Sequence, residues 1–245
     1  MNLTRSEFEA ELHRIFTLNG LDALLCNEVC EKFYILTEIM LTENEKYNLT
    51  AITEPGKIIL NHYADCVMLA SKIKENAKVI DVGCGAGFPT LPLAIIRKDI
   101  KITAMDSTAK RINYVRNTCS TLGITNVTAI AARAEDEARK NEMRESFDFA
   151  TARAVAQMRV LSELCLPFVK VGGCMLAMKG KNAEAEMQEA AHAITVLGGE
   201  VEEYGQIELK GGEEIFTHPI ISVRKKSRTP QIYPRAFAQI SKKPL

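Results

Sequence analysis

The sequence predicts an α/β fold: a doubly wound, mostly parallel sheet with an antiparallel hairpin at its edge and a helical cap at its N-terminus. Three observations lead to this prediction. Beyond residue 78, apolar runs rich in β-branched residues alternate with segments of helical periodicity, which is typical of βαβ units. The run 79–82 leads through closely spaced glycines into a helical pattern. Residues before 73 show helical periodicity and no strand pattern.

Apolar side chains at helical spacing predict three helices in the cap. The first carries Phe8 and Phe16 on one face, the second has a pattern from Leu21 to Met40, and the third opens at Pro55. A turn is expected over 46–53. Because no Gly/Ser-rich linker follows, we expect the cap, residues 1–72, to pack on the α/β domain, residues 73–245.

The α/β domain is expected to contain further strands at 101–106, 127–131, 147–151 and 174–178. Helical patterns lie between them and after them, at 110–122, 158–169 and 184–197. Two strand-like segments, 200–209 and 215–223, are joined through a pair of glycines and predict the closing hairpin.

Composition bounds the class of protein. At 245 residues, with 47% hydrophobic and 25% charged positions, the chain has the composition of a soluble globular protein. No apolar run is long enough to predict a membrane span, and the polar N-terminus does not resemble a secretory signal. The seven cysteines lack C-x-x-C spacing, which favours reduced thiols over disulfides or a metal site. We therefore expect a cytoplasmic, monomeric protein without a metal.

The C-terminal tail carries an uneven share of the charge, although the net charge is zero. The last acidic residue is Glu214, and two aromatic residues, Tyr233 and Phe237, lie among the basic residues that follow it. This pattern predicts a tail that attracts the phosphates of a nucleic acid, with a merely solubilising tail as the alternative. The basic residues are Arg224, Lys225, Lys226, Arg228, Arg235, Lys242 and Lys243.

The glycine turn after the first strand indicates the class of ligand. A dinucleotide-binding turn would have a third glycine where this chain has Phe88, followed here by Pro89. A bulky side chain at a helix start suits a flat ligand better than a pyrophosphate. An acid also stands inside the strand, and the whole pattern resembles the first motif of S-adenosylmethionine-dependent methyltransferases. Its residues, with Phe88, are the first cofactor-binding candidates: Asp81, Gly83, Gly85 and Gly87.

Ligands of doubly wound sheets bind at the carboxyl ends of the strands, and this rule adds four candidates. Asp106 follows the second strand and is placed to accept both ribose hydroxyls, or it only caps the next helix. After the third strand, Ala134 offers its backbone, and Glu135 or the neighbouring Asp136 is expected to bind the adenine amine. Glu135 is alternatively a solvated acid of a first helical turn. Arg153 follows the fourth strand and either binds guanine or cofactor, or pairs with Asp81.

Four runs occur together: Tyr-Asn-Leu-Thr-Ala-Ile at 47–52, His-Tyr-Ala-Asp at 62–65, Asp-Val-Gly-Cys-Gly-Ala-Gly-Phe-Pro at 81–89 and Thr-Ala-Arg-Ala-Val-Ala at 151–156. With Lys-Gly at 179–180 and a basic Tyr-Pro-Arg tail, they resemble the bacterial small-subunit ribosomal RNA guanine-N7 methyltransferase family, also called glucose-inhibited division protein B. The resemblance runs from about residue 40 to the C-terminus. The tail departs from the family at Ala238 and Ile240, where Gly and Pro are usual.

The resemblance implies a class I, Rossmann-like methyltransferase that uses S-adenosylmethionine and acts on ribosomal RNA or the small ribosomal subunit. It implies cofactor contacts at Gly83, Phe88, Ala134, Glu135 and Arg153. The implied reaction agrees with what the sequence lacks. Guanine N7 carries a lone pair and no proton, so its attack on a methyl group needs positioning and no general base. The expected set of catalytic acids and bases is therefore none, with Arg153 as the one possible participant.

Motifs of other methyl acceptors are missing. Residues 151–154 read Thr-Ala-Arg-Ala where amino-directed enzymes place Asn/Asp-Pro-Pro-Tyr/Phe. Cys165 and Cys174 look like packing thiols and not like the nucleophile of a cytosine enzyme. Two other functions stay open: a small-molecule methyltransferase with the same cofactor, and a cofactor-binding RNA-binding protein without turnover.

Substrate RNA is expected to contact three regions. Asn48 and His62 of the cap are expected to wall the pocket, although His62 on an amphipathic helix is alternatively structural. Lys179 and Lys181 follow the fifth strand and are expected to hold phosphate. The tail is expected to grip the backbone and stack a splayed base through Arg224, Lys225, Arg228, Tyr233 and Arg235.

Overall fold

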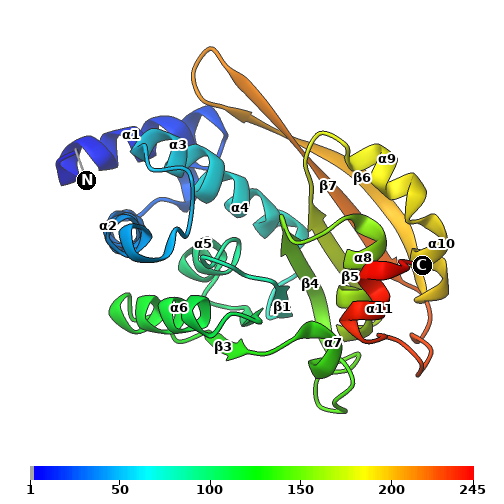
Figure 1. Ribbon diagram of the computed structural model, residues 1–245. Helices are drawn as coiled ribbons and strands as arrows, with labels where there is room; N and C mark the ends of the chain where they lie inside the picture. The colour runs from blue at the N-terminus through cyan, green and yellow to red at the C-terminus, as the bar shows by residue number, and fades with distance from the viewer. Residues whose placement is uncertain (1–2) are drawn as a thin grey trace.

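A computed structural model describes residues 3–245, apart from the side chain of Tyr47, and places one twisted sheet at the centre of the molecule (Figure 1). The described residues form seven strands in the order β3-β2-β1-β4-β5-β7-β6. β1 to β5 are parallel, and β7 runs antiparallel to both of its neighbours. The predicted doubly wound sheet with an antiparallel edge hairpin is confirmed. The strands are β1 (Lys78–Val82), β2 (Lys101–Asp106), β3 (Val127–Ala131), β4 (Phe147–Arg153), β5 (Val169–Met178), β6 (Gly199–Lys210) and β7 (Ile215–Lys225).

The strand order reverses between β1 and β4, and this point defines the ligand crevice. Asp81 lies opposite Ala104 of β2 on one side and Thr151 of β4 on the other. The carboxyl ends of the three strands therefore meet at one edge of the sheet. The loops that leave these ends are the ones that carry most of the predicted cofactor residues.

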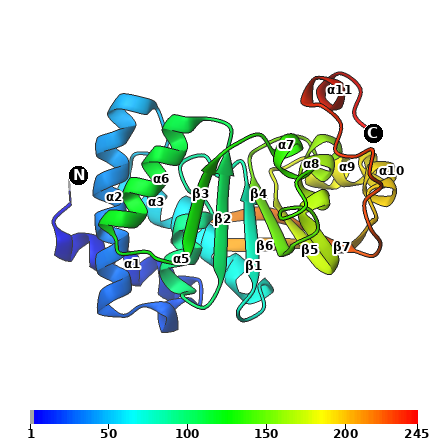
Figure 2. The same ribbon diagram turned by 90° about the horizontal axis from the view of Figure 1, so that it is seen from below.

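Helices cover both faces of the sheet because successive strand residues point to opposite sides. Val79 belongs to one buried cluster and its neighbour Ile80 to the other. Figure 2 shows the two layers, with the cap, α5 and α6 on one side and α7 to α11 on the other. These helices are α5 (Thr90–Ile96), α6 (Ala109–Thr121), α7 (Ala134–Glu137), α8 (Met158–Cys165), α9 (Ala183–Glu189), α10 (Ala191–Val196) and α11 (Phe237–Lys242).

The cap consists of α1 (Arg5–Leu18), α2 (Asn27–Tyr47) and a helical segment of changing pitch over 55–72. A capping box between Thr4 and Glu7 starts α1. The last segment comprises α3 (Pro55–Ile58), the π-helix η2 (Ile59–Ala64), α4 (Asp65–Val67) and the 3₁₀-helix η3 (Met68–Lys72). Buried cap side chains share one apolar cluster with α5 and α6, so the cap packs directly on the sheet domain.

Three predicted helices differ from the structure. The 21–40 pattern is split, because a 3₁₀ turn, η1 (Asp22–Leu24), precedes α2, which begins at Asn27. The 158–169 pattern ends at Cys165, because Pro167 has no N–H to continue the α-helical hydrogen bonds; a 3₁₀ turn, η4 (Leu166–Phe168), follows. The 184–197 pattern breaks at Ala190 between α9 and α10, and nothing in the structure explains that break.

Candidate active site

A cavity of about 320 Å³ opens at the carboxyl ends of the parallel strands. Its walls come from the ends of β1 and β2, the segments after β3 and β4, helix α8 and the C-terminal tail. Four of the predicted cofactor residues line it: Gly83, Asp106, Ala134 and Glu135. The edge of the sheet at which the sequence rule places a ligand therefore carries a cavity.

The glycine turn leaves no space for side chains at two positions. Gly83 and Gly87 both have positive φ, which favours glycine. A Cβ at Gly83 would lie 2.8 Å from Val155, and one at Gly87 would lie 2.5 Å from Leu91. These glycines let the turn pass close to the loop after β4 and to helix α5. Gly83 lines the cavity, whereas Gly85, Gly87 and Phe88 lie outside its lining.

Asp106 holds the glycine turn and faces the cavity at the same time. Its Oδ2 accepts the N–H of Gly85 at 3.1 Å, and its Oδ1 accepts the N–H of Thr108 at 2.8 Å. Arg111 Nη1 also lies 3.5 Å from Oδ2. A carboxylate has about four lone-pair positions, so Oδ1 retains capacity for a ligand, and Oδ2 retains it when a ligand displaces this long contact. The bond to Thr108 holds the start of α6, and Asp106 also lines the cavity. Capping the helix and binding a ligand are therefore compatible roles for Asp106.

The segment after β3 presents Glu135 and not Asp136. Glu135 is buried and lines the cavity, whereas Asp136 is exposed. The alternative that Glu135 is a solvated helix acid is wrong, because its side chain is only 8% exposed. Arg133 and Arg111 also line the cavity, and more than half of the Arg133 side chain is exposed.

Asp81 lies beneath the turn and does not reach the cavity. It accepts hydrogen bonds from the hydroxyls of Thr90 at 2.6 Å and Thr151 at 3.1 Å. Burial raises the pKa of Asp81 to about 6, although both hydroxyls act in the opposite direction. The predicted cofactor contact is corrected to a positioning role, in which Asp81 ties β1 to the start of α5 and to β4.

Arg153 points away from the cavity lining and into the cap. Its Nη1 lies 3.5 Å from Asp65 and donates to Cys66 Sγ at 3.2 Å, and its Nη2 donates to His62 Nδ1 at 3.0 Å. Its guanidinium also lies 5.9 Å from the centre of the Phe88 ring. The alternative of an Asp81 pair is not seen, because Arg153 pairs with Asp65. The next residue, Ala154, has the left-handed conformation and lines the cavity.

His62 is a buried member of the same cluster. Its ring stacks on Phe88 with centres 4.5 Å apart, and Nε2 lies 2.9 Å from Thr50 Oγ1. Burial, and to a smaller extent the Arg153 guanidinium, together lower the pKa of His62 to about 4. The ring is therefore neutral at pH 7, with Nδ1 as acceptor from Arg153. Asn48, the other predicted cap residue, is exposed at the end of α2 and makes none of these contacts.

Protonation of His62 gives a testable pH dependence. Between about pH 4 and pH 6.5 the unfolded chain binds a proton here and the folded protein does not, so this group makes stability rise with pH. Relative to His62→Gln, the wild-type protein is expected to lose up to about 3 kcal/mol of stability on acidification from pH 7 to pH 4. Denaturant unfolding of both proteins at several pH values measures this difference.

The comparison with His62→Gln is needed because Asp81 acts in the opposite direction. Its folded pKa, about 6, lies above its unfolded value, so the folded protein holds the extra proton and stability falls as pH rises from about 3.8 to 6. The wild-type profile alone would mix the two effects. A difference between the two proteins that does not change with pH would contradict the assignment of a neutral, buried His62.

Five residues of this site carry no site role in the sequence analysis: Thr50, Asp65, Thr90, Thr151 and His218. Asp65 is buried and also contacts His218 Nδ1 of β7 at 2.8 Å, so it joins the cap to two strands. Three of the five residues stand in the quoted motifs, which are the sequence signal for them: Thr50 in 47–52, Asp65 in 62–65 and Thr151 in 151–156.

The two lysines after β5 differ in their surroundings. Lys179 lies 2.6 Å from Glu186 and donates to the carbonyl of Ala156 at 2.7 Å. It therefore holds the cavity-lining loop after β4, and its side chain is only 9% exposed. Lys181 is exposed and remains a candidate for RNA phosphate.

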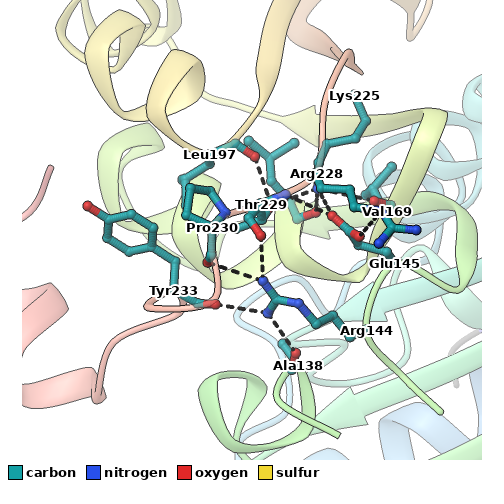
Figure 3. Close-up of polar contacts among 11 residues, drawn as sticks. Ala138, Arg144, Glu145, Val169, Leu197, Lys225, Arg228, Thr229, Pro230 and Tyr233 are labelled. Carbon is teal, nitrogen blue, oxygen red and sulfur yellow. Dashed lines mark hydrogen bonds and ion pairs between the residues drawn. The ribbon is translucent and has the colours of Figure 1, made fainter. Parts of the chain in front are cut away.

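Several cations of the basic tail are paired with acids, and Figure 3 shows one such acid, Glu145, beside Lys225 and Arg228. Lys225 is 1% exposed and donates to the carbonyls of Leu166 and Val169 and to Thr229, with Glu145 at 3.3 Å. Burial lowers its pKa to about 8. The prediction that Lys225 holds RNA phosphate is therefore corrected, because a phosphate has no access to its ammonium.

The other predicted tail residues divide in the same way. Arg224 pairs with Glu202 at 2.6 Å, and Arg235 pairs with the buried Glu163 at 2.6 Å. The ring of Tyr233 lies against the Arg235 guanidinium, with the centre 5.9 Å away. Arg228 is the exception, because its side chain is 88% exposed and its nearest acid, Glu145, lies 3.9 Å away. The tail thus presents less positive charge than its sequence suggests.

The cysteines are packing thiols, as predicted for Cys165 and Cys174. Both are buried, and burial raises the pKa of Cys174 to about 11 and that of Cys165 still further. In residues 3–245 no three metal-ligating side chains converge. Over the same residues, none of the helices has the length and apolar character needed to cross a membrane.

Comparison of sequences relates the chain to a described family. The family model described as "rRNA small subunit methyltransferase G" matches residues 29–215. "Ribosomal RNA small subunit methyltransferase G" of Clostridium perfringens (strain 13 / Type A) is 45% identical over 217 residues, which are 88% of this chain and 90% of that protein. The protein of the same name from Leuconostoc mesenteroides is 43% identical over 219 residues, 88% of this chain and 89% of its own.

Solved structures share the fold at low sequence identity. TYW2 of M. jannaschii, solved in complex with AdoMet, has a TM-score of 0.52 at 17% identity, covering 66% of this chain and 74% of that chain. A SAM-dependent O-methyltransferase of Thermotoga maritima has a TM-score of 0.51 at 18% identity, covering 78% and 73%. The [4+2]-cyclase SpnF has a TM-score of 0.52 at 15% identity, covering 66% and 81%. One of these is named as a cyclase, so the likeness shows the class I methyltransferase fold alone.

Proposed function

This chain belongs to the rRNA small subunit methyltransferase G family, and from that membership we propose that it transfers the methyl group of S-adenosylmethionine to N7 of a guanine in small-subunit (16S) ribosomal RNA. The chain is an enzyme, and S-adenosylmethionine is its cofactor. The observation that carries the proposal is the cavity in which Gly83, Asp106, Ala134 and Glu135 meet at the switch point of the sheet.

The donors and acceptors of this cavity fit S-adenosylmethionine. Asp106 retains lone pairs for the two ribose hydroxyls, and Glu135 presents a buried acceptor for the adenine amine. Gly83 lacks a side chain and so lets the turn pack against Val155, which lines the cavity with it. The bound cofactor supplies a methyl group on a positively charged sulfur. Asp81, Thr90 and Thr151 hold the turn that bears these contacts.

Positioning is the chemical task left to the protein. Guanine N7 has a lone pair and no proton to lose, so holding it in line with the methyl group suffices for attack. The buried thiols of Cys165 and Cys174, with their raised pKa values, do not supply the thiolate that carbon methylation of cytosine requires. Through its contacts with His62 and Asp65 of the cap, Arg153 fixes the start of the 154–156 loop, and this loop lines the cavity.

RNA phosphate is proposed to contact exposed cations around the cavity and on the tail. Arg111 and Arg133 line the cavity, with side chains 50% and 60% exposed. Arg228 and Lys181 are exposed farther along the chain. Neutralising one phosphate contact should reduce the salt dependence of RNA binding by about one unit of slope or less. Arg224, Lys179 and Arg235 are less suited to this role, because each lies 2.6 Å from its carboxylate partner. Arg111, Arg133 and Arg228 are 3.5 to 3.9 Å from theirs and are more exposed.

The proposal is tested by methyl transfer from labelled S-adenosylmethionine to small ribosomal subunits and to naked 16S RNA lacking the modification. Nuclease digestion followed by mass spectrometry is expected to show N7-methylguanosine. Cofactor binding without transfer to either RNA substrate would contradict the proposal and favour a small-molecule methyltransferase or an RNA-binding protein without turnover. A methylated base other than N7-methylguanosine would keep the enzyme and overturn the chemistry.

A further inference from the structure

The C-terminal tail supplies part of the cofactor cavity. Phe237, the first residue of α11, lines the cavity together with Leu164 of α8. Its side chain is among the few large apolar ones that are exposed in residues 3–245, at 41%. An aromatic ring that is half exposed and faces a cavity gains by packing on a flat apolar ligand. Phe237 entered the sequence analysis only as an aromatic residue among tail cations.

A buried ion pair sets the position of both apolar residues. Glu163 is fully buried and accepts hydrogen bonds from Arg235 Nη2 at 2.6 Å, from Arg235 Nε at 2.9 Å and from the Arg235 backbone N–H at 2.8 Å. Leu164 is the next residue after Glu163, and Phe237 lies two residues after Arg235. The pair therefore fixes the two sides of the cavity wall to each other.

Further contacts hold the segment that leads to Phe237 (Figure 3). The Arg144 guanidinium donates to the carbonyls of Thr229 at 2.7 Å, Pro230 at 3.2 Å and Tyr233 at 2.9 Å. Arg139 donates to the carbonyl of Pro234. These contacts arise from the segment between α7 and β4 and leave residues 229–235 little freedom. Phe237 is thus presented by an anchored segment.

We propose that Phe237 packs on the nucleoside of bound S-adenosylmethionine and so completes the cofactor site, with Arg235 as the residue that positions it. This inference rests on the proposed use of S-adenosylmethionine. The basic tail then has a second task besides any contact with RNA, because its anchoring arginine holds a wall of the cofactor cavity. The nucleoside is common to S-adenosylmethionine and S-adenosylhomocysteine, so Phe237 should contribute equally to both.

Calorimetric binding of both ligands to Phe237→Ala tests the proposal. Binding of each should weaken by about tenfold, with Phe237→Leu intermediate. Ile232→Ala is the matched control, because Ile232 is an exposed apolar residue of the same tail, at 68%, and does not line the cavity. It should bind both ligands as the wild-type protein does. Thermal unfolding without ligand should be the same for all these proteins.

Arg235→Lys distinguishes positioning from a purely structural role. It keeps the charge and loses the bidentate geometry, so it should weaken S-adenosylmethionine binding about fivefold in the wild-type background and have no further effect in Phe237→Ala. Unchanged binding in Phe237→Ala, or a raised KM for RNA alone, would overturn the inference and leave the proposed function intact. Failure of the wild-type protein to bind S-adenosylmethionine would instead overturn the proposed function, and this inference with it.

Discussion

Replacing Asp106 with alanine is expected to weaken S-adenosylmethionine binding at least a hundredfold and to remove methyl transfer at micromolar cofactor. Two sets of hydrogen bonds are lost together. The N–H groups of Gly85 and Thr108 lose their acceptor, so the glycine turn and the start of α6 are no longer held. The two ribose hydroxyls lose theirs as well. Hydrogen bonds to a charged group contribute about 1.5–3 kcal/mol each, so two of them account for a factor of 10² or more.

The matched control is Asp136→Ala, which removes an acid of the next strand–helix turn that is exposed and does not line the cavity. It should bind the cofactor within about twofold of the wild-type protein, since an exposed charge contributes little at physiological salt. Calorimetry gives the binding constants, and the transfer assay gives the activity. Equal losses in both variants would mean that net charge near the cavity, and not the geometry of Asp106, binds the cofactor.

The site residues that could be predicted from the sequence are those that stand at, or just after, the carboxyl end of a strand. Asp106 and Glu135 each stand at or just after a run of apolar residues, and parallel strands bring such ends to one edge. The periodicity that identified the strands also fixed the sheet with its antiparallel hairpin. Helix ends were less predictable, because they depend on local breaks such as the one that Pro167 imposes after α8.

The charge of the tail could not be judged from its sequence. Lys225 and Arg235 stand in an acid-free stretch, but their partners Glu145 and Glu163 lie more than 70 residues earlier in the chain. Folding brings them together, so counting charges along the sequence does not reveal the pairs. The cap cluster has the same origin, since Asp65 meets Arg153 and His218 from two different strands. The residues whose role was predicted wrongly, or not predicted, are those whose partners lie far away in the sequence.

Arg153→Met is expected to lower the free energy of unfolding by about 2–4 kcal/mol and the melting temperature by roughly 5–12 °C. Methionine fills much of the same space, but it removes the guanidinium from the buried Asp65 carboxylate and leaves it the contact with His218 Nδ1. It also removes the donor to His62 Nδ1 and the cation beside the Phe88 ring. A buried carboxylate that loses a guanidinium is costly, because the protein interior solvates the charge poorly.

The double variant Asp65→Asn/Arg153→Met separates this cost from a loss of packing. Because it also removes the charge of the Asp65 carboxylate, it should regain at least half of the stability that Arg153→Met loses. Asp65→Asn alone should be destabilising. Arg14→Met serves as the surface control, since Arg14 forms an exposed pair with Glu11 within α1 and should change the melting temperature by about 2 °C or less. A double variant less stable than Arg153→Met would show that the loss of the guanidinium beside Asp65 is not the main cost, and that Arg153 stabilises the cap through its contacts with His62 and Phe88. Arg153 connects β4 to the cap, and it thereby fixes the neighbouring Ala154, in its left-handed conformation, at the wall of the cofactor cavity.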